Sequence, residues 1–197
     1  MLRTSARDRI LEEGLRLACA GGLCRVTFGA IARRAHLSKS GIVAHFSNAD
    51  NLKAAIIASA IDLWRHACLV PAEDSSGLAE LRRYIGRWIN WTTRAGLPGG
   101  CPIASALFEY TYEQGSARAA VEAAEALWRK TLIDRIEDAI AESDFSHTVD
   151  PSQMAWSLLG VYLTHHVSAH FLRAPDADRR ALESVNRLIA FAQRAHS

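Results

Sequence analysis

The chain has 197 residues, 49% of them hydrophobic and 22% charged, the balance of an ordinary globular protein with a real core. The formal net charge of +2 is too small to mark a nucleic-acid binder by itself. However, Lys and Arg outnumber Asp and Glu within residues 1–47 and are outnumbered by them afterwards. No apolar run is long enough for a membrane span, and the N-terminus lacks a signal-peptide core, so we expect a cytoplasmic protein without membrane contacts.

The first 47 residues are expected to form three helices, at about 10–21, 28–35 and 38–46, because apolar residues recur there at helical spacing. Gly21 and Gly22 end the first helix, and Thr27 and Ser38 stand where N-caps of the second and third are expected. The tight turn between the second and third helices makes this pair a helix-turn-helix. Outward positions of the third helix carry small or cationic side chains, as a helix entering a DNA groove requires. They are Lys39, Ser40, Gly41, Val43 and Ala44.

Further helices are expected at about 48–68, 78–95, 103–112, 116–143, 150–172 and 176–195. Asn48 is the expected N-cap of the first of these, and Asp150 followed by Pro151 marks another helix start. Strand signals are absent, since there is no sustained alternation and no hairpin dipeptide. The sequence therefore predicts an all-α protein of about nine helices.

Residues 10–52 resemble the N-terminal signature of the TetR family of bacterial repressors. The positions that match the family pattern are Ile10, Leu11, Gly22, Thr27, Ile31, Ala32, Ala35, Ser38, Ile42, His45, Phe46, Asp50 and Leu52. Two positions depart from it: Val43 stands where the family usually has Tyr, and Ala49 where it usually has Lys. The resemblance implies a helix-turn-helix DNA-binding domain at residues 1–47 and a helical ligand-binding and dimerisation domain at 48–197.

The DNA-binding candidates divide into base-reading and phosphate-binding residues. Exposed residues of the third helix would reach base edges, and flanking residues would clamp phosphates, which sets register without reading sequence. Arg3 and Arg7 of the N-terminal arm are additional phosphate candidates, although an ordinary solvated charge is the alternative for any single one. The predicted DNA contacts are Thr27, Arg33, Ser38, Lys39, Ser40, Gly41, Val43, His45 and Lys53.

The family places its effector pocket among the helices that here carry most of the aromatic residues. Five tryptophans in one chain favour a roomy apolar cavity for a flat or greasy molecule, with plain core packing as the alternative. Cys101 begins a helix after two glycines, a setting in which a thiol becomes more reactive, although a small buried residue is the simpler interpretation. The predicted ligand-binding residues are Trp64, Tyr84, Trp88, Trp91, Cys101, Phe108, Tyr112 and Trp128.

The last two helices are apolar on broad faces, and in the family they pair with their twins in a four-helix bundle. A dimer also follows from DNA geometry, because one recognition helix reads only a few base pairs and two held about 34 Å apart read successive turns. The predicted interface residues are Trp156, Leu159, Leu163, His166, Val167, His170, Leu182, Val185 and Ile189.

Enzymatic and metal chemistry have little support in the sequence. The four cysteines form no C-x-x-C pair, and His165, His166 and His170 have no accompanying carboxylate or thiolate, so we expect no metal and no cofactor. No nucleophile–base pairing or phosphate-binding glycine loop is present, so no catalytic residue is assigned.

The sequence therefore predicts a TetR-like regulator, a repressor that binds a palindromic operator in double-stranded DNA as a homodimer and is released by a small apolar or aromatic effector. The alternative is a ligand-binding helical dimer of the same fold with weak or lost DNA binding, which the departures at Val43 and Ala49 motivate.

Overall fold

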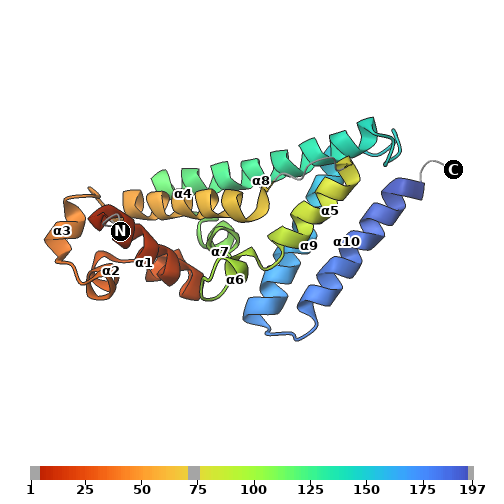
Figure 1. The fold of residues 1–197 in the computed structure, drawn as a ribbon. Helices are drawn as coiled ribbons and strands as arrows, with labels where there is room; N and C mark the ends of the chain where they lie inside the picture. Colours follow the sequence, from red (N-terminus) through yellow and green to blue (C-terminus); the bar gives the residue numbers. More distant parts are fainter. Residues whose placement is uncertain (1–4, 71–75, 195–197) are drawn as a thin grey trace. The chain divides into compact units, whose positions relative to one another are not determined.

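The computed structural model describes residues 5–70 and 76–194, and every regular element in that part of the chain is helical (Figure 1). The α-helices are α1 (Ala6–Gly21), α2 (Phe28–Ala35), α3 (Lys39–Val43), α4 (Ala49–Cys68), α5 (Gly77–Trp88), α6 (Trp91–Arg94), α7 (Pro102–Glu109), α8 (Ser116–Ala141), α9 (Pro151–His166) and α10 (Ala177–Arg194). Two short elements complete the list, the 3-10 turn η1 (Leu23–Arg25) and the π-helical turn η2 (Val167–Phe171). The expected all-α fold is confirmed. Arg3 and the expected last residue of the final helix lie outside the described residues.

The chain divides into two compact units. Unit 1 comprises Met1–Trp64 and Thr92–Glu125, and unit 2 comprises Arg65–Trp91 and Ala126–Ser197. The long helices α4 and α8 therefore each contribute residues to both units. Among the described residues, no helix combines the length and apolarity that crossing a bilayer requires.

Side-chain caps define the helices at the start of unit 1. Thr27 Oγ1 accepts the amide of Ala30 at 3.1 Å, and Ser38 Oγ accepts the amide of Gly41 at 3.0 Å. Asn48 Oδ1 accepts the amide of Asn51 at 2.8 Å. These three caps are the ones that the sequence predicted, and each supplies an acceptor to amides that a helix start leaves without partners.

The core of unit 1 forms where the apolar stripes of these helices meet. Ile10, Leu23, Ile31, Ile42 and Leu52 are completely buried. Gly14 of α1 lies directly against the side chain of Ile56 in α4, so that a larger residue there would require this side chain to move. Burial of these side chains fixes the inward face of α3 through Ile42, and it therefore fixes which residues of α3 face outward.

Later segments of unit 1 are tied to α1 and η1 by polar contacts with the backbone. The Glu109 carboxylate at the end of α7 accepts the amides of Leu23 at 3.1 Å and Cys24 at 2.8 Å, which are the first residues of η1. Gly100 donates its amide to the carbonyl of Cys19 in α1 at 3.2 Å. Gly99, with φ +86°, packs against that same carbonyl, where a side chain would not fit. Asp50 of α4 accepts the first amides of α8.

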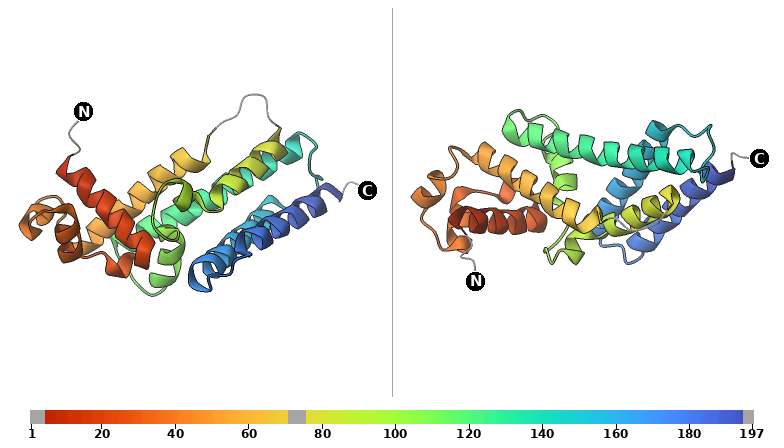
Figure 2. Two further views of the ribbon diagram at one scale, coloured as in Figure 1. Left: turned by 60° about the horizontal axis from the view of Figure 1, so that its bottom comes forward. Right: turned by 45° about the horizontal axis from the view of Figure 1, so that its top comes forward.

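In unit 2, α9 and α10 run antiparallel, side by side (Figures 1 and 2). Asp150 caps α9 by accepting the amides of Ser152 and Gln153, and Pro151 occupies the first turn, as predicted. The start of α5 packs against the end of α8, because the Gly77 amide donates to Glu142 at 2.6 Å and a Cβ on Gly77 would lie 2.5 Å from the Ala139 backbone nitrogen.

Several expected helices differ in detail from those observed: α1 begins at Ala6 and α3 ends at Val43. The helix expected at 78–95 is two, α5 and α6, because Asn90 takes a left-handed conformation (φ +59°) and donates to Asp178 of α10 at 2.5 Å. The helix expected to reach residue 112 ends at Glu109. The carbonyls of the next two residues, Tyr110 and Thr111, accept hydrogen bonds from the Arg118 guanidinium. The helix expected to reach residue 172 is α9 as far as His166, followed by the π-helical turn η2.

Candidate nucleic-acid interface and ligand site

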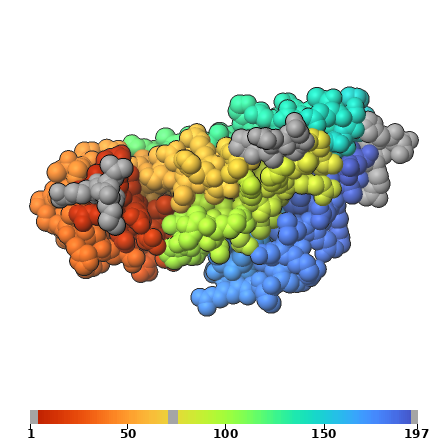
Figure 3. Space-filling model, viewed as in Figure 1, coloured from red at the N-terminus to blue at the C-terminus, as the bar shows by residue number. Residues whose placement is uncertain are grey.

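The outer face of α3 is free of bulk, as the sequence predicts. Lys39, Ser40, Val43 and Ala44 are exposed, and Gly41 is half-buried. The segment that contains α2 and α3 lies at the molecular surface (orange in Figure 3). A short helix with this surface can approach base edges closely and still offer a lysine and a serine hydroxyl as donors.

Two cations from neighbouring helices gather over Gly29 of α2. A Cβ built on this glycine lies 3.3 Å from Lys39 Cε and 3.8 Å from an Arg33 terminal nitrogen. Within the described residues neither cation forms an ion pair, whereas the adjacent Arg34 is bound to Glu13 at 2.6 Å. The Arg33–Lys39 pair is therefore a local concentration of uncompensated positive charge beside the exposed face of α3, which suits phosphate binding.

The remaining predicted DNA contacts lie around this pair. Thr27, Ser38 and His45 are exposed, and Lys53 in α4 is half-buried. The hydroxyl of Thr27 accepts a cap bond and keeps its O–H to donate to a phosphate, whereas the Ser38 hydroxyl accepts a cap bond and also shares a hydrogen bond with Ser40 Oγ at 3.0 Å. Ala49, at the position where the family usually has Lys, is exposed and offers no charge.

Four of the predicted ligand residues lie in unit 2, where three of them form one aromatic cluster with Tyr162. Tyr84 stacks on Trp88 with ring centroids 5.5 Å apart, and Trp88 stacks on Tyr162 at 4.0 Å. Trp128 meets both Trp88 and Tyr162 edge-on, at 5.2 and 5.4 Å. Trp91 joins the cluster by donating its indole N–H to the Tyr162 hydroxyl at 3.2 Å.

The cluster contains donors that are buried without acceptors. Trp88 is 1% exposed, and no described residue accepts a hydrogen bond from its Nε1. The same holds for Nε of Arg135 in α8, whose guanidinium carbon lies 5.3 Å from the centre of the Tyr84 ring. Burial raises the pKa of Tyr84 well above its usual value, so its phenol stays neutral. The cluster is thus apolar and contains two N–H groups, Trp88 Nε1 and Arg135 Nε, for which no described residue provides an acceptor.

The other predicted ligand residues are placed differently. Trp64 and Cys101 are buried in unit 1. Cys101 Sγ caps α7 by accepting the Ala104 amide, and burial raises the pKa of the neighbouring Cys19 thiol to about 12. Phe108 is 59% exposed and Tyr112 is 94% exposed, so the described residues do not enclose either side chain.

The predicted interface helices expose a broad apolar surface. Several large side chains of α9, η2 and α10 face outward. The helices α9 and α10 form a continuous blue surface in Figure 3. The exposed residues are Trp156, Val167, Phe171, Leu172, Leu182 and Phe191. Leu163 and His166 are half-buried and His170 is exposed. Leu159, Val185 and Ile189 are instead buried by their own chain.

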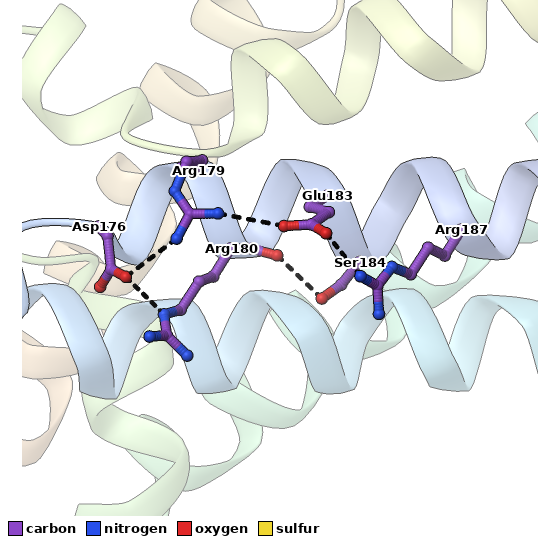
Figure 4. A network of polar contacts seen from close by, with 6 residues as sticks. All are labelled: Asp176, Arg179, Arg180, Glu183, Ser184 and Arg187. Carbon is purple, nitrogen blue, oxygen red and sulfur yellow. Dashed lines mark hydrogen bonds and ion pairs between the residues drawn. The ribbon is translucent and has the colours of Figure 1, made fainter.

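Charged side chains accompany this surface. Along α10, Arg179 bridges Asp176 and Glu183, and Glu183 also binds Arg187 (Figure 4). Arg180 reaches back to Asp176 at 2.7 Å. A hollow of about 550 Å³ lies between α9 and α10 and includes Gly160, Val161 and Ser184 in its lining.

Beneath this surface, a hydrogen-bonded set joins three elements of unit 2. His165 of α9 is 4% exposed, and its Nε2 lies 2.7 Å from Asp178 Oδ1 of α10. Asn90 donates to the other oxygen of Asp178. The hydrogen bond from His165 holds the pKa of Asp178 below its usual value. Burial lowers the pKa of His166 to about 4, so this histidine is neutral at neutral pH.

Arg135 and Tyr162 belong to the aromatic site, although they are not among the ligand residues that the sequence predicts. Tyr162 lies on a helix whose apolar face was assigned to dimerisation, and only the packed structure shows that it turns inward. Arg135 follows Leu132 by three residues on one face of α8, so its position on an apolar stripe was the signal that the sequence offered.

Comparison with known proteins agrees with this architecture. Residues 10–56 match the model of bacterial regulatory proteins of the tetR family. Residues 77–185, more than half of the chain, match the model of the tetracyclin repressor-like C-terminal domain. No curated protein matches the chain.

Solved structures share the fold at low identity. A TetR transcriptional regulator from Chloroflexus aurantiacus is 22% identical, with a TM-score of 0.81 over 94% of this chain and 93% of that one. A TetR-family regulator from Cytophaga hutchinsonii is 18% identical, with a TM-score of 0.81 over 94% of each chain. AibR, solved with isovaleryl coenzyme A and operator DNA, is 24% identical, with a TM-score of 0.72 over 94% and 98%. The two family models, which cover both the helix-turn-helix and the C-terminal helices, show that the chain belongs to the TetR family of transcriptional regulators, which are DNA-binding proteins and not enzymes.

Proposed function

We propose that this protein is a transcriptional repressor that binds a palindromic operator as a homodimer and leaves it when a small apolar or aromatic effector binds. The observation that carries the proposal is the exposed, bulk-free face of α3 beside the unpaired cations Arg33 and Lys39. If α3 served only to complete the fold, this exposed surface would have no function. The repulsion between its unpaired positive charges also destabilises the folded protein, unless an anion such as DNA phosphate binds them.

In this proposal the residues of α3 read bases, and their neighbours hold phosphates. Lys39, Ser40, Gly41 and Val43 face the major groove. Thr27, Ser38, Arg33, His45 and Lys53 contact the backbone of the duplex and set the register. The functional division falls between α3 and α4: residues 1–47 form the DNA-binding domain, to which Lys53 of α4 adds a contact, and residues 48–197 bind the effector and the second subunit. A regulator that binds an operator in the cell's DNA would work in the cytoplasm, which is the location that we propose.

The dimer is proposed from the exposed side chains of α9, η2 and α10. Trp156, Leu182 and Phe191 would become buried against the second copy, with Leu163, His166, Val167 and His170 beside them. Association through one self-complementary surface gives two-fold symmetry, and a two-fold dimer requires an operator with two inverted half-sites.

The effector is proposed to bind at the aromatic cluster of unit 2, which includes Tyr84, Trp88, Trp91 and Trp128. The buried Trp64 and Cys101 are proposed to change their packing when the effector binds. AibR was solved with both an acyl coenzyme A and operator DNA, which supports a link between a small molecule and DNA binding in this fold. Release requires two arrangements of the DNA-binding domains (residues 1–47) in the dimer, of which the effector favours the one that does not fit the operator. The coupling free energy between effector and DNA binding is typically 1–3 kcal/mol. Movement of α4 would carry this coupling to the head, because Phe46 and Leu52 on either side of the α3–α4 junction are buried.

Fluorescence anisotropy on labelled duplexes from the promoter beside its own gene tests the DNA-binding part. We expect binding that distinguishes this DNA from a scrambled duplex and that weakens steeply with salt. Equal binding to both duplexes at every salt concentration would remove the repressor proposal.

A second candidate function is a ligand-binding dimer that has lost DNA binding, and the exposed Val43 and Ala49 favour it, since neither supplies the interaction usual at its position. Replacing Val43 with Tyr and Ala49 with Lys discriminates. If the wild type does not bind any operator and the double variant gains binding, the second function is the correct one.

A further inference from the structure

The hollow between α9 and α10 is lined largely by small side chains. It measures about 550 Å³, and half of its lining residues have side chains no larger than that of serine. These small residues are Gly160, Ser168, Ala174, Ala177, Ala181 and Ser184. Ala177 and Ala181 are buried, whereas Gly160 and Ser184 are exposed, so the hollow opens at the surface of unit 2.

Gly160 lies where its own chain does not require a glycine. A Cβ built on it would meet no atom of the described residues within 4 Å, and its backbone does not take a left-handed conformation. Glycine inside a helix costs about 1 kcal/mol relative to alanine. A group from outside the chain that enters the hollow at this point would give the glycine a purpose.

Trp156 projects from the same face of α9, one helical turn before Gly160. It is 63% exposed, whereas the other four tryptophans of the chain are at most 1% exposed. Tryptophan is enriched among the residues that contribute most to protein–protein binding, where it fills pockets on the partner. One surface of unit 2 therefore carries both a large projecting side chain and, next to it, an open hollow.

A second copy of the chain is the occupant that matches this pair of features. A two-fold dimer joins the same surface of both copies, so that a projection and a hollow on one copy can meet a hollow and a projection on the other. An axis that lies in the interface, midway between Trp156 and the hollow and perpendicular to the line joining them, places each Trp156 over the partner's hollow. The hollow is also continuous with the surface of the proposed dimer, because Leu172 lines it and is 63% exposed.

The chemistry of the lining suits an indole. Val161 and Leu172 provide apolar contacts, and Ser184 Oγ donates its proton to the Arg180 carbonyl at 2.9 Å (Figure 4). The Ser184 oxygen can therefore still accept a hydrogen bond. An indole combines an apolar body with one N–H donor, whereas the exposed Phe and Leu side chains of this surface have no donor.

We propose that Trp156 of each copy inserts into the hollow between α9 and α10 of the other copy, and that this reciprocal contact sets the register in which the two copies pair. The inference rests on the proposed dimer and names the contact that specifies it.

Two complementary variants of the full-length protein test the proposal when they are mixed. Trp156→Ala removes the projecting side chain and leaves the hollow, whereas Gly160→Leu blocks the hollow and leaves Trp156. Each variant alone loses both contacts of its dimer. A mixed dimer keeps one contact, formed by Trp156 of the Gly160→Leu copy and the open hollow of the Trp156→Ala copy.

We expect each variant to weaken its own dimer at least tenfold, and the mixed dimer to exceed the share that random pairing gives. Analytical ultracentrifugation of each variant gives the dissociation constant, and native mass spectrometry of the mixture separates the three dimers by mass. No excess of the mixed dimer, or variant dimers as tight as the wild type, overturns the proposal. A small molecule or a different side chain in the hollow would give no such excess.

Matched variants away from the hollow are the controls. Gly86 of α5 is also an exposed helical glycine whose Cβ would meet nothing within 4 Å among the described residues, and Phe108 is an aromatic residue of unit 1 that is 59% exposed. Gly86→Leu and Phe108→Ala should each dimerise like the wild type and show no preference for the mixed dimer. Equal weakening in these controls overturns the proposal. Circular dichroism shows whether each variant keeps its fold.

The inference and the proposed function fail separately. A dimeric wild type whose two variants pair at random keeps the proposed dimer and loses the Trp156 contact. A wild type that is monomeric at the concentrations at which it binds DNA loses the dimer as well. Operator binding by the wild type, measured by anisotropy, decides the repressor function independently of both.

Discussion

At the scale of single residues, the helix-turn-helix at residues 1–47 shows which side chains are exposed or paired because of their near neighbours in the chain. Ile42 of α3 is buried and Ser40 and Val43 are exposed, because the helical period turns both of them away from the face of Ile42. The same reasoning separates Arg33 and Lys39, which have no described ion-pair partner, from Arg34, whose charge Glu13 already neutralises.

Replacing either unpaired cation should weaken operator binding and its salt dependence. We expect Lys39→Ala and Arg33→Ala each to lower affinity, with the salt slope falling by about 1 for every phosphate that the variant no longer neutralises. Arg34→Ala, on the same helix but already ion-paired, is the control and should change the slope less. Anisotropy titrations between low and moderate salt give these slopes. Identical slopes in all three variants would contradict the assignment.

His166 should make the stability of the protein depend on pH. Its pKa is lowered from 6.5 to about 4, chiefly by burial, so between these values the unfolded chain binds a proton that the folded chain does not. Stability therefore falls as the pH drops from about 6.5 to 4, by about 2 kcal/mol once partial exposure is discounted. Urea unfolding at pH 7.5 and 5 should show a smaller loss in His166→Asn than in the wild type. The exposed His66→Asn is the control, and a wild-type-like loss in His166→Asn would exclude this cause.

The role of a residue can be predicted from the sequence when that role depends only on near neighbours in the chain. The caps Thr27, Ser38 and Asp150 were predicted because a cap needs only the next three residues. Arg135 and Tyr162 were not, because their meeting with Tyr84 and Trp88 depends on three helices that are distant in sequence.

At the scale of elements, carboxylates from one helix terminate or begin another. Glu109 of α7 provides acceptors for the first amides of η1, and Asp50 of α4 does so for α8, with Ser116 N at 2.6 Å and Ala117 N at 3.2 Å. These hydrogen bonds join segments of unit 1 that lie far apart in the sequence. They fix where η1 and α8 begin.

Removing either carboxylate should therefore cost about as much as losing a helix cap. We expect Glu109→Ala and Asp50→Ala each to destabilise the protein by about 1 kcal/mol, or about 2–4 °C in Tm for a chain of this size. Glu113→Ala, an exposed residue, should have almost no effect. Thermal unfolding followed by circular dichroism measures the difference. No change in either cap variant would show that water replaces the carboxylates without cost.

The presence of most helices could be predicted from the sequence, but the residues at which they begin and end could be predicted less well. The helices α4, α8 and α9 were predicted because each is long and carries apolar residues at helical spacing. The break between α5 and α6 was missed, because Asn90 leaves the helix to bind Asp178 in α10, a partner that local sequence does not reveal.

At the scale of the whole molecule, the exposed apolar side chains of α9, η2 and α10 require a partner. A single exposed Leu needs no explanation, but Trp156, Phe171, Leu182 and Phe191 are four large side chains on neighbouring elements of unit 2. This surface is the basis of the proposed dimer.

Charges placed within that surface should separate the subunits. We expect Trp156→Asp and Leu182→Asp to convert the dimer to a monomer with unchanged helix content, because burying an unpaired carboxylate costs several kcal/mol. Operator affinity should then fall sharply, since only one half-site is held at a time. Light scattering coupled to size exclusion gives the mass, and Ala126→Asp, at an exposed position of α8, is the control. A variant that remains dimeric would place the interface elsewhere.

Selection of binding sites from randomised DNA duplexes shows whether the helix-turn-helix of this protein reads sequence as half of a symmetric pair. We expect enrichment of an inverted repeat whose half-sites lie about one helical turn or a multiple of it apart, and loss of that enrichment in Lys39→Ala. Recovery of random sequence by the wild-type protein, or of a repeat that Lys39→Ala selects equally well, would exclude sequence reading by α3.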